Sequence, residues 1–550
     1  MNLKLRRSIA AFMAWSVLSA AAAVSAAPSL SRPGDEIGSE RPKPSAGLED
    51  NLPEVPPETK MTVFTLKNIE LDASELKLNK AEVAKILEGC LNREVTLAEL
   101  NDTVNQLTVY CRQHGYPASA AYLPAQDSAD GSITIRIIPG RYGRILLDNQ
   151  SELKDDVVVG FTRGLKPGEI IRTEKLETTL YSISDLSSSK AVGVLAPGEE
   201  FGTSDITIRV EKGKSTNTVL YAENYGSSSS GRYRFGLQHS IFDVGGTGAK
   251  INVGALLSNK NLHNYYVNYE TLVGRGGTTL GIGFSRMDYQ LGGLASVFGA
   301  NGYAHTLSIY GSRPIFHMTD RELRFVYGYD YRKLTDDMDS YGGVMDLDKH
   351  SHNVHFGVTG FQKNPGIAID YSAMLTMGNL SIDSHTRYSE IVRQSSGTEG
   401  GYTKAEANVT AVQALGHRTD LMLKLGGQIA GKNLDSSEEF YLGGARGVRA
   451  YPQGDSSGDE GWQGTAEFRY YTDLPGLVLS AYLDGGHVKI THDGRGGTRT
   501  LKGWGLGISY SRPNDWFARL DYARRIGGYE NMSEDAASKG RTWFILGKVW

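Results

Sequence analysis

The sequence has only two cysteines, Cys90 and Cys111, in 550 residues. At most one intramolecular disulfide can form, so the chain is not a disulfide-stapled scaffold. After its first residues the chain has no long apolar run, and its mean hydropathy of −0.33 argues against membrane-spanning helices. A formal net charge of −4 offers no general basic surface, so we expect no nucleic-acid partner. None of this excludes a membrane β-barrel, because barrel strands alternate apolar and polar residues.

Residues 1–26 have the three parts of a signal peptide. Lys4, Arg6 and Arg7 make a basic start, an apolar run follows, and Val24-Ser25-Ala26 supplies small residues for cleavage. The mature chain is therefore expected to be exported into an oxidising compartment. There we expect a disulfide between Cys90 and Cys111.

Residues 27–60 are rich in Pro, Ser, Glu and Asp and almost lack aromatic and β-branched residues. This composition predicts a disordered linker. Two segments follow, 61–141 and 142–212, and each shows the pattern strand, helix, helix, strand, strand. We interpret them as two copies of one α+β module. Cys90 and Cys111 lie near the ends of the two helices of the first copy, where a bridge would join them.

The sequence pattern changes in residues 216–550, which contain sixteen strand-like runs. Each run has roughly the ten residues that a tilted strand needs to cross a bilayer. The connections between them alternate between short and long. A soluble sandwich or barrel has no reason to segregate loop length by side, whereas outer-membrane barrels have short turns on one side and long loops on the other. The predicted fold is therefore two α+β modules followed by a 16-stranded antiparallel transmembrane β-barrel.

One connection, residues 431–463, stands out because it is about thirty residues long, and loops of that length are functional or disordered. Its central part reads GGARGVRAYPQGD and carries Arg446 and Arg449. Charged residues in a glycine-rich loop between amphipathic strands indicate a loop that folds back into the barrel. Either arginine could then reach the barrel wall.

The period-2 pattern of the neighbouring strands gives the wall that this loop would meet. In residues 477–488 it directs Asp484 into the lumen, and in residues 464–472 it directs Glu467 and Arg469 inward. Arginine can hold a carboxylate with two parallel hydrogen bonds. We therefore expect Arg446 or Arg449 to pair with this acidic wall, with Glu467 and Arg469 as lumen-facing support.

Four short motifs carry a family resemblance: Val448-Arg449-Ala450-Tyr451, Asp484-Gly485-Gly486, Gly115-Tyr116 and Asp130-Gly131. Together they resemble the outer-membrane transporters of two-partner secretion, of the haemolysin-secretion/activation and adhesin-exporting type. In that family the loop motif is Val-Arg-Gly-Tyr/Phe, so Ala450 departs from it. The resemblance implies that Arg449, with Val448 and Tyr451 beside it, is the functional tip and pairs with Asp484, with Gly485 as lumen-facing support. Some members have a pore-plugging helix before the first module. The prolines of residues 27–60 do not suit a long helix here.

The resemblance implies a translocase of the outer membrane with two POTRA modules in the periplasm. The implied partners are the lipid bilayer and a large β-helical exoprotein of haemolysin or adhesin type. It implies no cofactor, no metal, no catalytic residue and no enzymatic activity. An outer-membrane assembly or insertion factor is the main alternative, although such factors usually carry more modules. A passive porin needs no modules, and a barrel enzyme would need an inward-facing His with a nucleophile and an acid.

Overall fold

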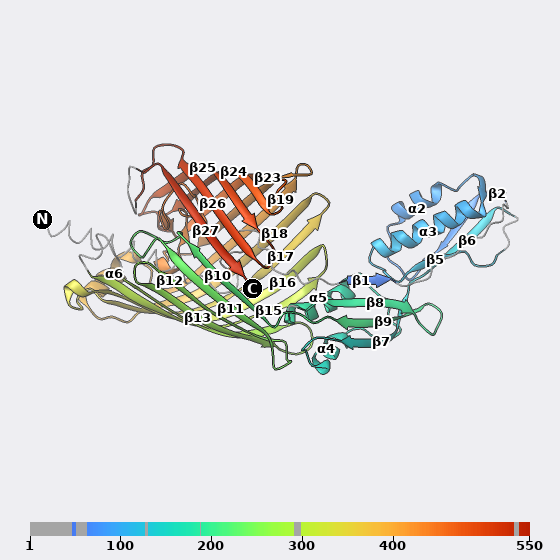
Figure 1. The fold of residues 1–550 in the computed structure, drawn as a ribbon, viewed down its shortest axis with the longest axis horizontal. Coiled ribbons are helices and arrows are strands. Elements are labelled where there is room, and N and C mark those ends of the chain that lie inside the picture. The colour runs from blue at the N-terminus through green and yellow to red at the C-terminus, as the bar shows by residue number, and fades with distance from the viewer. Residues whose placement is uncertain (1–46, 51–62, 127–129, 188, 291–298, 533–537) are drawn as a thin grey trace.

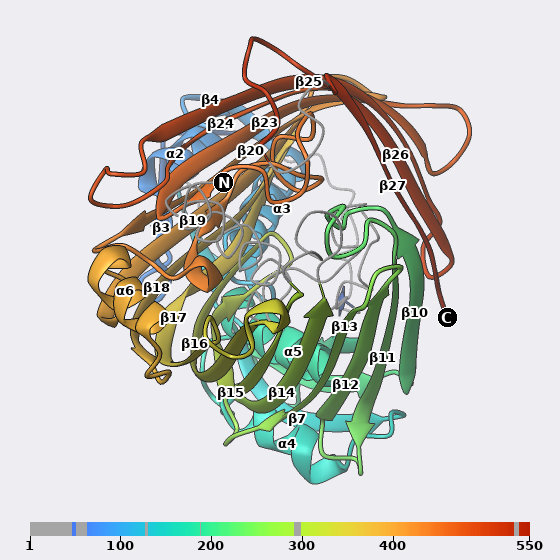
Figure 2. The same cartoon turned by 90° about the vertical axis from the view of Figure 1, so that its left-hand side faces the viewer.

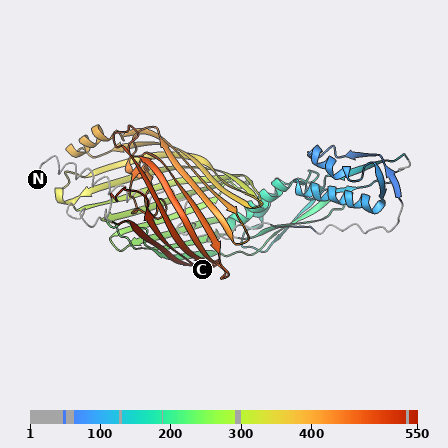
Figure 3. The ribbon, with the colours of Figure 1, turned by 90° about the horizontal axis from the view of Figure 1, so that it is seen from above.

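The computed structural model describes residues 47–50, 63–126, 130–187, 189–290, 299–532 and 538–550. The expected signal peptide lies outside these residues, as does most of the expected linker. The chain forms a β-barrel with two α+β modules in line at one end of it (Figures 1 and 3). Figure 2 views the barrel from its other end, with the strands arranged around a common axis. Among the described residues, none of the helices combines the length and the apolar character needed to cross a membrane.

The first module packs two helices on a sheet with strand order β3-β6-β5, beside a small β2-β4 pair. Its second helix begins at the expected capping box, where Thr96 and Glu99 satisfy each other's backbone N–H groups. The backbone N–H of Thr96 donates to the Glu99 carboxylate and, with Arg93, lowers the pKa of Glu99 to about 2. The elements are β2 (Val63–Leu66), β3 (Asn68–Asp72), α2 (Lys80–Glu88), β4 (Arg93–Thr96), α3 (Leu97–Gln113), β5 (Ala120–Tyr122) and β6 (Ser132–Ile138).

The expected disulfide is wrong for this structure, because Cys90 and Cys111 are both buried free thiols. The Cys90 sulfur lies 2.9 Å from the hydroxyl of Thr103 on α3. Cys111 lies eight residues further along the same helix, which is about 12 Å at 1.5 Å per residue. A disulfide needs Cα atoms within about 7 Å of each other. Both side chains instead belong to the apolar core of the module.

The first module departs from the predicted order, because β4 lies between its two helices and pairs with β2. The second module has the predicted order, with β7 (Arg141–Asn149), α4 (Asp155–Thr162), α5 (Thr173–Ser187), β8 (Ala191–Pro197) and β9 (Thr203–Val210). Its sheet has a fourth strand, β1 (Gly47–Asp50), which pairs in parallel with β8. The expectation of disorder throughout residues 27–60 is therefore wrong at residues 47–50. The pairing uses backbone groups along the open edge of β8, so composition gives no sign of it.

The barrel closes with sixteen antiparallel strands, because β10 pairs with both β11 and the last strand, β27. The predicted strand number is therefore confirmed. The strands are β10 (Thr216–Glu223), β11 (Arg234–Val244), β12 (Ala249–Ser258), β13 (Leu262–Leu272), β14 (Thr279–Gln290), β15 (Ala300–His317), β16 (Arg321–Met338), β17 (Leu347–Asn364), β18 (Ile367–Ile382), β19 (Gly400–Ala414), β20 (Thr419–Ala430), β23 (Glu460–Tyr471), β24 (Leu477–Lys489), β25 (Thr498–Ser511), β26 (Trp516–Arg525) and β27 (Gly540–Val549).

Strands β15, β16 and β17 have 18 residues each, well beyond the ten expected. Their extensions occupy stretches whose sequence reads as loop. Outside the bilayer a strand needs no apolar outer face, so pairing continues after the alternating pattern stops. A helix, α6 (Arg387–Ser396), lies in another expected loop and begins at Thr386, whose hydroxyl accepts from the Ser389 N–H.

The short turns lie at the module end of the barrel. Helix α5 of the second module contacts the turn between β15 and β16, where the Tyr181 hydroxyl lies 3.1 Å from the Thr319 hydroxyl. The Arg324 guanidinium on β16 pairs with Asp185 of α5 at 2.5 Å. The second module is thus joined by charged and polar contacts to the barrel end with the short turns.

Candidate functional site

The connection between β20 and β23 enters the barrel and is called the inner loop here, residues 431–459. It contains a short 3-10 turn, η4 (Ser436–Glu438), and two paired segments, β21 (Phe440–Tyr441) and β22 (Ser457–Gly458). The residues between β21 and β22 form the tip. The tip is tightly turned: the Val448 N–H donates to the Leu442 carbonyl at 2.8 Å, and the Tyr451 N–H donates to the Val448 carbonyl at 3.1 Å.

The structure brings Arg449 of the tip onto Asp484 of β24. The Arg449 Nε donates to one Asp484 oxygen at 2.8 Å, and Nη2 donates to the other at 2.8 Å. The backbone N–H of Arg449 donates to the same carboxylate at 3.2 Å. The two residues are only 7% and 4% exposed, respectively. Such a two-pronged contact fixes the orientation of the guanidinium as well as its position.

Two further carboxylates reach the same guanidinium. The Arg449 Nη1 lies 3.1 Å from Glu467 on β23 and 3.4 Å from Asp521 on β26. Arg519 on β26 pairs with both of these acids, at 3.0 Å and 2.7 Å. The cluster therefore holds two arginines against three carboxylates, all from strands β23, β24 and β26 except Arg449. Buried charges of this kind are stable only when paired and hydrogen-bonded.

Sequence reasoning missed two aromatic contacts to Arg449. The guanidinium carbon lies 3.2 Å from the centre of the Tyr482 ring, a cation–π contact. The Trp543 indole N–H donates to the Arg449 carbonyl at 2.7 Å. Trp543 lies on β27, where Ile545 is also buried. An apolar inward face departs from the expected polar lumen, and that departure is the signal that something packs against this wall.

The other predicted tip residues pack rather than pair. Val448, Ala450 and Tyr451 are fully buried in an apolar cluster with residues of the wall, namely Leu501 of β25 and Ala523 of β26 among others. Ala450 does not have a positive φ, so the alanine in place of the family's glycine fits this turn without strain. The tip is thus held by an apolar contact as well as by charge.

Two expected support residues do not take part. Gly485 follows the inward-facing Asp484, so its own side-chain position is directed out of the barrel, and a Cβ there would meet nothing closer than 3.9 Å. The glycine that faces the loop is Gly486, where a Cβ would lie 2.4 Å from the Leu442 side chain. Arg469 pairs with Asp420 of the neighbouring strand at 2.6 Å and not with the inner loop. Arg446 of the tip is exposed.

Residues 454–458 read Gly-Asp-Ser-Ser-Gly, the pattern found around some hydrolase nucleophiles. Here Ser456 precedes the short strand β22 instead of a helix. Within the part of the chain that the structure describes, its buried Oγ has no hydrogen-bond partner. In the same described part, no group of three or more His, Cys, Asp or Glu could hold a metal ion.

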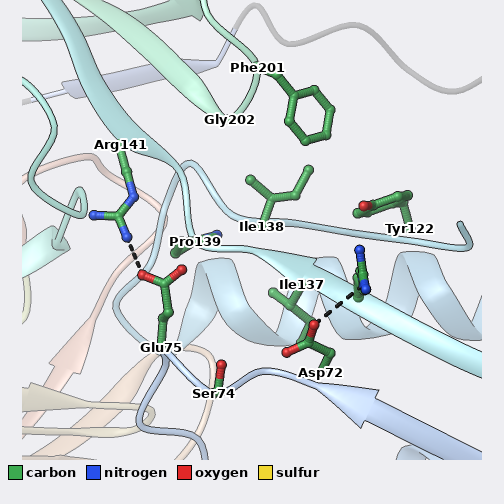
Figure 4. A pocket seen from close by; sticks show the side chains of 11 residues that line it. Asp72, Ser74, Glu75, Tyr122, Ile137, Ile138, Pro139, Arg141, Phe201 and Gly202 are labelled. Atoms are coloured by element: carbon green, nitrogen blue, oxygen red, sulfur yellow. Dashed lines mark hydrogen bonds and ion pairs between the residues drawn. The ribbon is translucent and has the colours of Figure 1, made fainter.

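A pocket lies where the two modules meet (Figure 4). The pocket has a volume of about 310 Å³ and is lined by acidic, basic and apolar side chains. Arg141 pairs with Glu75 across the junction, and Phe201 of the second module contacts Tyr122 of the first at 6.3 Å between ring centres. The ion pair and the ring contact join the modules, and no set of catalytic groups converges there.

Comparisons with known proteins agree with this architecture. The family model described as "POTRA domain, ShlB-type" matches residues 64–140, and the model "Haemolysin secretion/activation protein ShlB/FhaC/HecB" matches residues 202–510. The Heme/hemopexin transporter protein HuxB of Haemophilus influenzae is 24% identical over 500 residues, which cover 88% of this chain and 87% of HuxB.

Two further relatives are CdiB proteins. The outer membrane transporter CdiB of Dickeya dadantii is 23% identical over 446 residues, covering 77% of this chain and 76% of CdiB. The structure of CdiB from Escherichia coli superimposes with a TM-score of 0.67 at 18% identity, covering 91% and 93% of the two chains, and so shares the fold. The chain belongs to the haemolysin secretion/activation family ShlB/FhaC/HecB, and it is an outer-membrane translocase for a partner exoprotein, with its POTRA domain in the periplasm.

Proposed function

We propose that the exoprotein is a large β-helical protein of haemolysin or adhesin type, and that the Arg449–Asp484 contact is a lock that holds the inner loop in the conformation needed for secretion. The observation that carries the proposal is the two-pronged contact itself, buried inside the barrel at the tip of the loop. A surface ion pair would contribute little.

The client is an unfolded chain when it reaches the periplasm, and the modules meet it first. Residues 141–210 form a second unit, which repeats the order of the first apart from the short β2-β4 pair, and we assign it as a second POTRA module. Extended chains bind such modules by adding a strand to an open sheet edge. Folding of the client outside the cell then supplies the free energy, since the family likeness involves no nucleotide.

The name of the Haemophilus relative suggests a second class of client, an exoprotein that binds heme or hemopexin. At 24% identity the relative shares the transport machinery and not necessarily the cargo. The two client classes differ in a property that is directly measurable, which is binding of heme or hemopexin by the secreted protein.

The experiment compares the proteins in the culture medium of three strains. They are a strain that carries this chain, a strain from which its gene is deleted, and the deletion strain complemented with the gene. We expect one large, β-rich protein to disappear from the medium on deletion and to return on complementation. Circular dichroism of the purified protein and a heme-binding titration then assign its class. An unchanged secretome, or loss of a small helical protein only, would contradict the proposal.

A further inference from the structure

The inner loop contacts the barrel wall at a second place, far along the strand order from Arg449. This contact involves the 3-10 turn η4, near the start of the loop, and Asp435 just before it. One oxygen of Asp435 accepts the Ser437 N–H at 3.1 Å and so caps the turn. The capped turn presents two carboxylates, Asp435 and Glu438, to strands β16, β17 and β19.

The Glu438 carboxylate is contacted from three strands. Arg332 of β16 pairs with it at 2.6 Å and Lys404 of β19 at 3.0 Å. The Asn353 amide of β17 donates to the same carboxylate at 3.3 Å. Glu438 is only 5% exposed, so the pairs are shielded from water.

The Asp435 carboxylate has its own cation. The Lys349 ammonium of β17 lies 2.9 Å from Asp435 and 3.2 Å from Asp336 of β16, and Lys349 is 1% exposed. Without the loop, this lysine would keep one of its two carboxylates. The Asp435 carboxylate of the loop thus has a wall cation as its partner, as buried charges require, so the wall favours the presence of the loop here.

We infer that Asp435 and Glu438 form a second anchor, which holds the first limb of the inner loop, residues 431–441, inside the barrel independently of Arg449. The inference rests on the proposed role of the Arg449–Asp484 contact in holding the inner loop. The tip contact lies on β23, β24 and β26, whereas the second anchor lies on β16, β17 and β19. Release of the tip alone therefore leaves the first limb in place, and the whole loop leaves the lumen only when both contacts break.

The test measures ion conductance of the purified full-length protein in planar lipid bilayers. The variant Asp435→Asn with Glu438→Gln removes both charges, and the introduced asparagine side chain can still cap η4. We expect a several-fold higher open probability than wild type, and a further increase when Arg449→Ala is added. Heat-modifiability on gels checks that each barrel is folded.

Glu406→Gln is the matched control, because Glu406 pairs with the same Lys404 at 3.5 Å but belongs to β19 and not to the loop. It should conduct as wild type does. A second test exchanges charges, Asp435→Lys with Lys349→Asp, which keeps one cation between two carboxylates. The exchange should close a pore that Asp435→Lys alone opens. If the neutralised variant does not insert into the membrane, this comparison tests the inference in its place.

The inference is overturned if the neutralised variant is as closed as wild type while Arg449→Ala opens the pore, or if the exchange stays as open as Asp435→Lys alone. It is also overturned if Glu406→Gln opens the pore equally, since the effect would then belong to the wall. A pore that stays closed in Arg449→Ala but opens on neutralisation would contradict the proposed role of the tip, and not the second anchor.

Discussion

The Arg449 guanidinium of the inner loop contacts three carboxylates of the wall, Asp484, Glu467 and Asp521. Its removal would leave Arg519 to balance three buried carboxylates. Removing one partner from a buried ion pair costs about 3–5 kcal/mol, whereas an exposed pair contributes roughly 0–1 kcal/mol. The position of the tip therefore depends on Arg449 far more than on any exposed charge of the loop.

The cysteines give a prediction at the same scale. We expect unreduced protein, unfolded in denaturant and treated with iodoacetamide, to take up two alkyl groups without any reductant. In the native protein alkylation should be slow, because burial shields both thiols and raises the pKa of Cys111 to about 11. Since an unfolded thiol ionises near its ordinary pKa, this burial opposes folding only above about pH 9.

Mass spectrometry of the intact protein measures the uptake. If neither cysteine is alkylated until a reductant is added, the two form a disulfide, and the result contradicts the structure.

Single residues show where sequence reasoning succeeds and where it stops. The period-2 pattern alone places Asp484 and Glu467 on the inner wall, because each strand residue faces one side or the other. Applied two residues after Asp484, the same pattern places Gly486 toward the loop and Gly485 on the outer face, so the expectation for Gly485 did not follow the pattern. Trp543 could not be assigned, because its role depends on a backbone carbonyl of a loop more than ninety positions earlier in the chain.

The inner loop fits against β24 because Gly486 has no side chain. A Cβ at Gly486 would lie 2.4 Å from the Leu442 side chain and 2.6 Å from the Trp462 carbonyl, so Gly486→Ala must displace the loop or the strand. We expect this variant to insert but to show higher pore conductance and reduced secretion. Gly485→Ala is the matched control, since the nearest atom to its Cβ, the Leu501 carbonyl oxygen, would lie 3.9 Å away. Equal behaviour of the two variants would show that the fit at Gly486 does not hold the loop.

Elements were predictable to the extent that local patterns define them. The capping box at Thr96 and Glu99 marks the start of α3, and the second module follows its expected order. In the first module the strand β4 lies between the two helices, which the predicted order lacks. The strand β1 and the extensions of β15 to β17 were not predictable. Both depend on a backbone ladder offered by a neighbouring strand, and a ladder leaves no periodic trace in the sequence.

At the scale of the molecule, the modules should select the client, since the barrel cannot select a chain that it has not yet met. A fragment of residues 47–212, which keeps β1, should therefore retain the N-terminal region of the client in a pull-down. Each module has its own apolar core, which supports testing them apart from the barrel. No enrichment over an unrelated periplasmic domain would count against recognition by the modules.

The architecture as a whole was accessible from the sequence because two signals are global: sixteen runs with alternating polarity, and connections that alternate in length. An even number of strands lets the last strand, β27, pair antiparallel with the first, β10, and so close the barrel. The way in which the inner loop is held was accessible only in part, because the sequence marks the arginine and the aspartate but not the second set of contacts at Asp435 and Glu438.

The central claim is that the buried contact of Arg449 with Asp484 operates secretion. The most direct test measures the client in the medium against the amount of barrel in the outer membrane. Arg449→Ala should abolish or strongly reduce secretion at normal barrel levels, and Arg449→Lys should also be defective because lysine lacks the two-pronged geometry. Arg446→Ala, three residues earlier and exposed, should secrete as wild type does. Secretion at the wild-type level by Arg449→Ala would contradict the account.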